Sequence, residues 1–63
     1  MVYENVMHYA RLKGIPIYKL EKEAGIAQNS IAKWKNHSPS VASVIAVAKV
    51  LGVSMNLITS GKE

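Results

Sequence analysis

The apolar residues of this chain recur at intervals of three and four positions, the spacing that places side chains on one face of a helix. In one stretch, Ile17, Leu20 and Ala24 follow this spacing across two helical turns. Similar spacing occurs before and after it, interrupted by glycine, proline and short polar stretches. The pattern predicts an all-α protein of five helices, over about residues 1–13, 16–24, 28–35, 41–51 and 55–59.

The same periodicity predicts which side chains form the core. In the third predicted helix Ile31 and Trp34 are three positions apart on one face, so we expect Trp34 to be packed in the core rather than exposed for base stacking. In the short last helix we expect Leu57 to point inward. The inward face of the helix over 41–51 is expected to consist of Val44, Val47, Ala48 and Leu51.

A glycine separates the second and third predicted helices. Gly25 directly follows Ala24, at the position where a helix often ends in a left-handed residue that glycine adopts without steric cost. The helix after it carries amide and lysine side chains on the face opposite Ile31. Two short helices joined by a tight turn form a helix-turn-helix pattern.

Serine and glycine mark the ends of the last two helices. Ser40 is suited to cap the N-terminus of the helix over 41–51, and Gly52 directly follows its last residue. Ser54 has the same capping role for the fifth helix. Residues 60–63 are a polar tail that we expect to be frayed.

The positive charge of the chain coincides with the helix-turn-helix pattern. The chain has 63 residues and a formal net charge of +4, and about half of its residues are apolar (49%), which suits one small domain over residues 1–63. Between Arg11 and Lys35 there are six bases and two acids, a difference (6 − 2 = 4) equal to the whole net charge. This distribution favours a polyanion as partner. The alternative is a solvated lysine face that only keeps the domain soluble.

The composition provides little for catalysis or metal binding. The chain has no cysteine and no aspartate, and its two histidines, His8 and His37, are far apart in sequence. We therefore expect no catalytic set, no metal site and no cofactor. We find no signal-peptide pattern and no apolar run long enough to span a membrane, so a soluble cytoplasmic protein is expected.

Two extended motifs make the helix-turn-helix pattern more specific. The chain contains G-I-P-x-x-x-L-x-x-x-A-G-I-x-x-x-x-I-x-x-W, then P-S-V-x-x-V-x-x-V-A-x-x-L-G-V-S with a following leucine, Leu57. Over about Val6 to Ile58 the chain resembles the phage repressor/Cro (XRE-type) helix-turn-helix family. The resemblance implies a five-helix lambda-repressor-like fold whose third helix lies in the major groove of DNA.

The resemblance also implies which residues contact DNA. Amides pair with adenine and lysine with guanine, each good pair discriminating by roughly 1–3 kcal/mol. Hydroxyls, amides, lysines and helix N-termini also donate to phosphate. The matching base-contacting positions are Gln28, Asn29 and Lys33, with Ser30 as a lesser contact, and the phosphate-contacting positions are Tyr18, Lys19, Lys35, Asn36 and Ser38.

The chain departs from the family pattern at five positions. Where the family often has capping Ser or Thr residues before its second and third helices, this chain has Pro16 and Ala27, at an expected cost of about 1 kcal/mol each. Ile17 stands in place of a glutamine that contacts DNA. An arginine–glutamate pair common in the family is replaced by Ala10 and Lys35, so neither charge is stranded and Lys35 is free to face phosphate.

The resemblance favours a sequence-specific, double-stranded DNA-binding transcriptional regulator, a repressor of phage or prophage type. A homodimer on two half-sites of an inverted repeat about 34 Å apart is expected, because one such module buries too little surface for tight binding. The alternative is a protein-interaction module of the same fold, antitoxin- or antirepressor-like; an enzyme is the least favoured reading. No small-molecule ligand and no membrane partner are indicated, and the expected dimer contacts are Val50, Met55 and Ile58.

Overall fold

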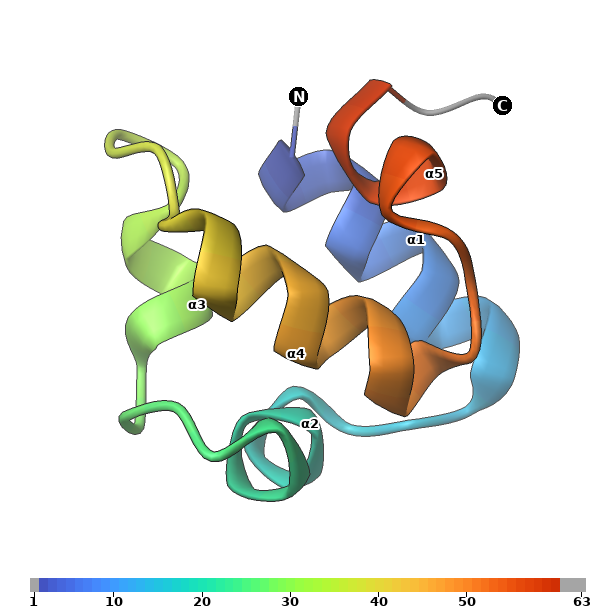
Figure 1. The fold of residues 1–63 in the computed structure, drawn as a ribbon. Helices are drawn as coiled ribbons and strands as arrows, with labels where there is room; N and C mark the ends of the chain where they lie inside the picture. Colours follow the sequence, from blue (N-terminus) through green and yellow to red (C-terminus); the bar gives the residue numbers. More distant parts are fainter. Residues whose placement is uncertain (1, 61–63) are drawn as a thin grey trace.

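The computed structural model describes residues 2–60, which form five helices and contain no strand (Figure 1). The all-α class and the order of the predicted elements are therefore confirmed. Met1, the first residue of the first predicted helix, and residues 61–63 of the predicted frayed tail lie outside the described residues. The helices are α1 (Val2–Lys13), α2 (Ile17–Ala24), α3 (Ser30–Lys33), α4 (Val41–Leu51) and α5 (Met55–Ser60).

The helix α4 is the centre of the packing. It crosses in front of α1 in Figure 1, with α2 below it, α3 at its left-hand end and α5 above its right-hand end. It packs against α2, α5 and α1, and its predicted inward face is buried as expected. Trp34 is only 9% exposed, which confirms its expected place in the core. The buried apolar residues are Val6, Ala10, Leu20, Ile31, Trp34, Val44, Val47, Ala48, Leu51 and Ile58.

The predicted signals at the ends of α2 and α4 have the expected geometry. Gly25 and Gly52 adopt left-handed conformations, with φ of 74° and 72°. After α2, the Gly25 N–H donates to the Lys22 carbonyl and the next N–H donates to the Glu21 carbonyl, so two carbonyls at the helix end are satisfied. At the start of α4 the Ser40 hydroxyl accepts from the Ser43 N–H at 3.2 Å, which confirms Ser40 as the N-cap.

The third helix is shorter than predicted. The helix was expected to start at Gln28, but α3 begins at Ser30 and extends only to Lys33. Gln28 and Asn29 belong to the turn before it, and residues 34–36 continue after it as tighter turns. The expected start is wrong because Asn29 has a left-handed backbone (φ 69°, ψ 9°), which a continuous right-handed helix excludes.

The inward face of α5 also differs from the prediction. Ile58 is fully buried (0% exposed), whereas Leu57, expected to point inward, is only partly buried. The Asn5 side chain of α1 donates to the Ile58 carbonyl at 2.8 Å, which ties α5 to α1 at this residue. Ile58, which was expected as a dimer contact, therefore has no surface for a partner, since packing on α1 and α4 selects the face of this short helix.

Candidate nucleic-acid interface

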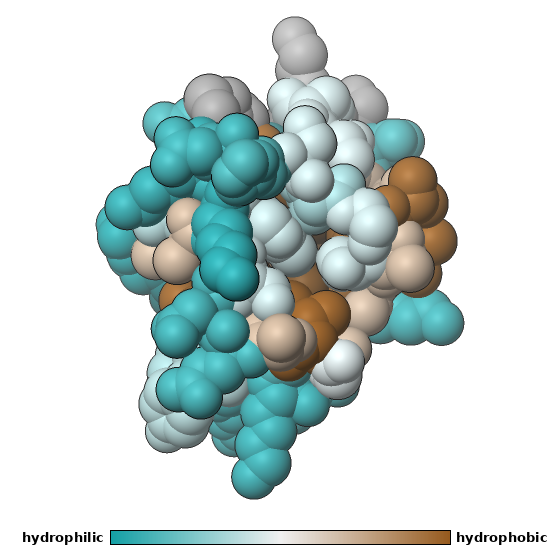
Figure 2. Space-filling model, turned by 90° about the vertical axis from the view of Figure 1, so that its left-hand side faces the viewer, coloured by the Kyte–Doolittle hydropathy of each residue, from teal (hydrophilic) through white to brown (hydrophobic). Residues whose placement is uncertain are grey.

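The turn after α2 and the outer face of α3 form a polar surface. Gln28, Asn29 and Lys33 are all exposed there. Figure 2 shows the molecule from the side on which α3 lies, and hydrophilic residues cover the left-hand and lower parts of that face. Hydrophobic residues gather at its right-hand edge and in a smaller area below the centre. The sequence-predicted base-contacting residues thus lie on an accessible and mainly hydrophilic surface.

Asn29 has a structural role in addition to its predicted contact with a base. Its residue type fits its backbone, because asparagine adopts a left-handed conformation at lower cost than other residues that carry a Cβ. The turn is closed by the Ser30 N–H, which donates to the Ala27 carbonyl at 3.1 Å. Asn29 is the third residue of this turn, a position where φ > 0 is found with glycine or asparagine in type II turns.

The N-terminus of α3 is capped by a side chain from α2. One carboxylate oxygen of Glu21 accepts from the Asn29 N–H at 3.0 Å, and the other accepts from the Ile31 N–H at 3.1 Å. Glu21 is only 4% exposed. Glu21 therefore supplies the cap that Ala27 lacks, to N–H groups eight and ten residues further along the chain. The loss of stability expected for a missing cap does not apply to α3. At α2, in contrast, Pro16 makes no side-chain capping bond, as expected.

The sequence analysis did not predict Glu21 as the cap of α3, although its position on α2 was a signal for this role. On α2 the apolar positions 17, 20 and 24 define the inward face, and position 21 follows the fully buried Leu20 on that side. An acid on this face requires donors, and the nearest free donors are the first N–H groups of the next helix.

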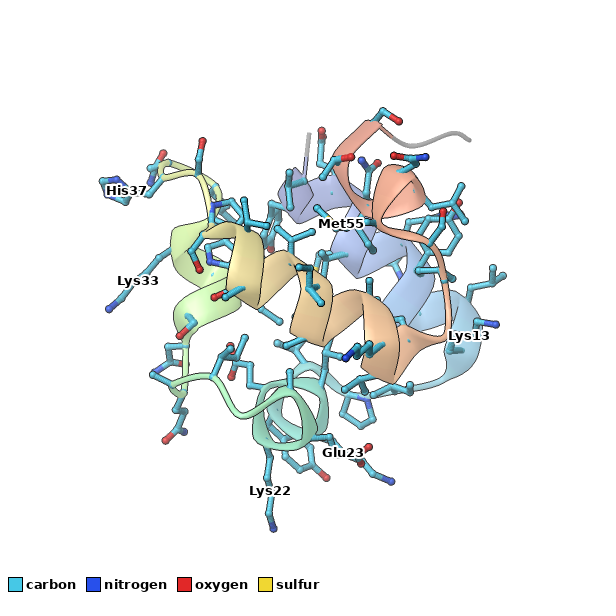
Figure 3. The ribbon with its side chains drawn as sticks, in the orientation of Figure 1. Lys13, Lys22, Glu23, Lys33, His37 and Met55 are labelled. Carbon is cyan, nitrogen blue, oxygen red and sulfur yellow. The ribbon has the colours of Figure 1, made fainter. Side chains whose placement is uncertain are left out.

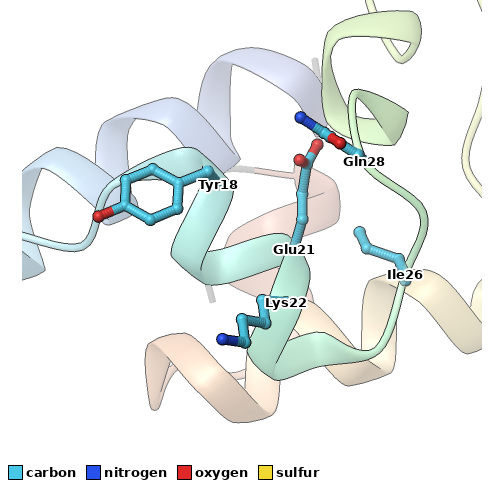
Figure 4. Close-up of a pocket in the computed structure, with 5 residues that line it drawn as sticks. All are labelled: Tyr18, Glu21, Lys22, Ile26 and Gln28. Atoms are coloured by element: carbon cyan, nitrogen blue, oxygen red, sulfur yellow. The ribbon is translucent and has the colours of Figure 1, made fainter.

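A hollow of about 240 Å³ lies beside the turn and contains two of the predicted contact residues (Figure 4). Tyr18, which is 71% exposed, and Gln28 line it from opposite sides. In Figure 4 the Glu21 side chain extends toward Gln28. Lys22 and Ile26 complete the lining and were not among the predicted contacts. The hollow is thus lined by an amide, a phenol, an ammonium group, an aliphatic side chain and the Glu21 carboxylate.

A second hollow, of about 280 Å³, brings together three of the predicted phosphate-contacting residues. Lys35, Asn36 and Ser38 line it together with His37, and all four are exposed. The Lys35 ammonium lies 5.2 Å from the centre of the Tyr3 ring, which orients it without neutralising its charge. This loop therefore presents a cation, an amide and a hydroxyl side by side, and each of these groups can donate to a phosphate.

Two predicted contact residues are engaged with the protein itself. The Ser30 hydroxyl donates to the Ala27 carbonyl at 2.6 Å, so only its lone pairs are available to a base. The Lys19 ammonium lies 3.9 Å from a carboxylate oxygen of Glu23, with both side chains about half exposed (58% and 49%). A pair so exposed is weak, and a phosphate can replace the carboxylate.

The lysines labelled in Figure 3 lie on different sides of the molecule. Lys33 and His37 point outward on the side of α3, and Lys22 points outward below it. Lys13 lies at the opposite end of the molecule, so its substitution changes the net charge without changing the surface around α3. The positive charge next to α3 comes from two helices and a loop, and the fold brings these elements together.

The expected dimer contacts differ in exposure. Met55 is 38% exposed and is available to a partner, whereas Val50 is partly buried and packs against the core. Ile58 has no exposed surface. Two further exposed apolar side chains lie on α4: Val41 is 65% and Ile45 is 39% exposed, and they are four positions apart on one face.

Asn29 is expected to tolerate glycine better than alanine. Alanine at a left-handed position should lower the free energy of unfolding by about 1 kcal/mol, while glycine adopts φ > 0 freely and should change it less. Urea unfolding of Asn29→Ala and Asn29→Gly measures the difference. Both variants remove the amide, so any loss of DNA preference shared by them reports the base contact alone. Equal stabilities would show that the left-handed backbone of Asn29 is not maintained in solution.

Two further features concern residues 2–60, the part of the chain that the structure describes. Within this range no group of three or more His, Asp or Glu side chains is arranged to hold a metal ion. The described helices are also too short or too polar to cross a bilayer.

One comparison with known proteins gives a match. A family model described as helix-turn-helix matches residues 7–58, which is most of the chain and includes all the predicted DNA-contacting residues. No curated protein and no solved structure matches the chain.

Proposed function

The chain belongs to the XRE-type helix-turn-helix family of DNA-binding regulators, and from this we propose that it is a sequence-specific transcriptional regulator of double-stranded DNA. The observation that carries the proposal is the exposed set Gln28, Asn29 and Lys33, presented at the turn and on α3 of a matched helix-turn-helix. Amide and ammonium groups at this place suit adenine and guanine edges in the major groove.

The two hollows beside this surface support a contact with both the bases and the DNA backbone. Lys35, Asn36 and Ser38 offer donors to one phosphate group, and Tyr18 and Lys22 offer donors on the other side of the turn. Ile26 next to Gln28 provides an apolar surface for a thymine methyl group. We propose that these contacts orient α3 in the groove.

We further propose a repressor of phage or prophage type that works in the cytoplasm and binds an inverted repeat as a homodimer. A single module of this size buries too little surface for tight specific binding, which favours two copies on half-sites about 34 Å apart. Of the expected dimer contacts, Met55 has the exposure that such an interface needs.

The second candidate is a protein-interaction module that retains the fold with weak DNA binding. Ile17 in place of a DNA-contacting glutamine favours it, and so does the exposed apolar pair Val41 and Ile45 on α4. The exposed amides and lysines beside α3 favour DNA.

Selection from random duplex DNA tests the proposal. The purified chain is incubated with the pool at moderate salt, and the retained duplexes are sequenced. We expect an enriched inverted repeat whose half-site spacing reports the dimer. Retention without enrichment would leave only non-specific electrostatic binding, and no retention would favour the protein-interaction module.

A further inference from the structure

Glu21 is a charged side chain in the interior of this small domain. It is 4% exposed and is the buried charged residue within the described range 2–60. Burying a carboxylate is costly unless hydrogen bonds compensate. Both of its oxygens are satisfied, and both donors are backbone N–H groups from the turn and α3 rather than from α2 itself. The location of these donors connects Glu21 to DNA recognition.

The two N–H groups belong to the segment that presents the predicted base contacts. One N–H belongs to Asn29, itself a predicted base contact that directly follows Gln28. The other belongs to Ile31, the fully buried residue that anchors α3 in the core. The two bonds therefore hold the segment on both sides of Ser30. They also hold the left-handed backbone of Asn29, which the chain would otherwise adopt only at a cost.

We propose that the Glu21 carboxylate is a positioning residue for base recognition: it sets the backbone of residues 28–31 and so determines the sequence preference of the domain. This inference rests on the proposed function. Glu21 itself is only 4% exposed, and both of its carboxylate oxygens accept from backbone N–H groups, so we do not propose it as a base contact. Its effect on DNA passes through the directions of the Gln28 and Asn29 side chains, which follow from the backbone that it holds.

A carboxylate is the group that this arrangement requires. It offers an acceptor oxygen to each N–H, whereas a glutamine amide of the same shape offers one acceptor and one donor. In Glu21→Gln one backbone N–H therefore faces an NH₂ group, and that donor loses its partner. Aspartate retains the charge but is one methylene shorter, so it cannot reach both N–H groups in the same geometry.

The experiment compares Glu21→Gln with Glu23→Gln. Both residues are on α2 and both changes raise the net charge by one, but Glu23 is about half exposed and contacts Lys19. Affinities for the selected site and for an unrelated duplex are measured at one salt concentration. Relative to Glu23→Gln, we expect the ratio of specific to non-specific affinity of Glu21→Gln to fall about tenfold, the size of one lost base contact.

A readout without DNA shows whether the hydrogen bonds exist. Amide hydrogen exchange of Asn29 or Ile31 should be faster in Glu21→Gln than in Glu23→Gln, because one of these two N–H groups loses its partner. The folded fraction is checked by circular dichroism at the binding temperature. If Glu21→Gln is unfolded, Glu21→Asp is used instead, and we expect the same direction of change with the charge retained.

Each outcome has a separate meaning. An unchanged affinity ratio, together with faster exchange at Asn29 or Ile31, would overturn the positioning role and leave Glu21 as a stabilising residue only. Unchanged exchange would overturn the hydrogen bonds themselves. If the wild-type chain enriches no sequence, the proposed function fails first, and the exchange data then show separately whether Glu21 holds the turn.

Discussion

Replacing Ile58 with aspartate is expected to unfold the domain. Ile58 is fully buried between α5 and the helices it packs against, and its carbonyl accepts the Asn5 side chain at 2.8 Å. Removing a buried isoleucine side chain costs about 2–5 kcal/mol, and an unpaired buried carboxylate adds to this. A core of this size supplies about 3–5 kcal/mol in total, so the loss matches or exceeds it. Circular dichroism and urea unfolding measure the result.

Met55→Asp is the matched control for this substitution. Met55 lies on the same helix, is 38% exposed, and occupies the first turn, where an acid interacts favourably with the helix dipole. We expect it to leave the fold intact. A cooperative unfolding transition in Ile58→Asp equal to that of wild type would contradict the burial of Ile58. With the fold intact, the mass of Met55→Asp in solution and its DNA affinity also test whether Met55 belongs to a dimer interface.

The affinity for DNA is expected to fall steeply as salt increases. Four lysines lie exposed on α2, on α3 and in the turn after it: Lys19, Lys22, Lys33 and Lys35. If each neutralises one phosphate, the slope of log K against log salt is about −3.6, and a fourfold rise in salt weakens the binding of one copy of the chain to DNA about a hundredfold. Fluorescence anisotropy with a labelled duplex from 50 to about 200 mM salt covers this range.

The change in slope for single variants locates the contact. Lys35→Ala should reduce the magnitude of the slope by about 0.9, because one fewer counterion is released. Lys13→Ala should leave it unchanged, since Lys13 lies at the end of the molecule opposite His37, which shares a hollow with Lys35. Equal changes in both variants would show that binding depends on net charge and not on this surface. A slope near zero would point to an apolar protein contact instead.

Most of the fold could be predicted because its signals are local. The left-handed Gly25 and Gly52, the Ser40 cap and the inward face of α4 each depend on residues within a few positions of one another. Periodicity over three helical turns was also enough to place α4 correctly. The same pattern predicted that Gln28 and Lys33 are exposed, because it places them on the face opposite Ile31.

The sequence by itself determined the all-α class, the glycine turns, the core of α4 with Trp34, and a basic helix-turn-helix surface. Only the tertiary structure decided the start of α3, the left-handed Asn29 and the burial of Ile58. The cap of α3 comes from Glu21, which is eight and ten residues away from the N–H groups that it caps. The packing of α2 in the fold brings this side chain to α3, so residues adjacent in sequence could not indicate it. In α5, six residues make fewer than two turns, too few for periodicity to define a face, so contact with α1 and α4 selects Ile58 instead of Leu57.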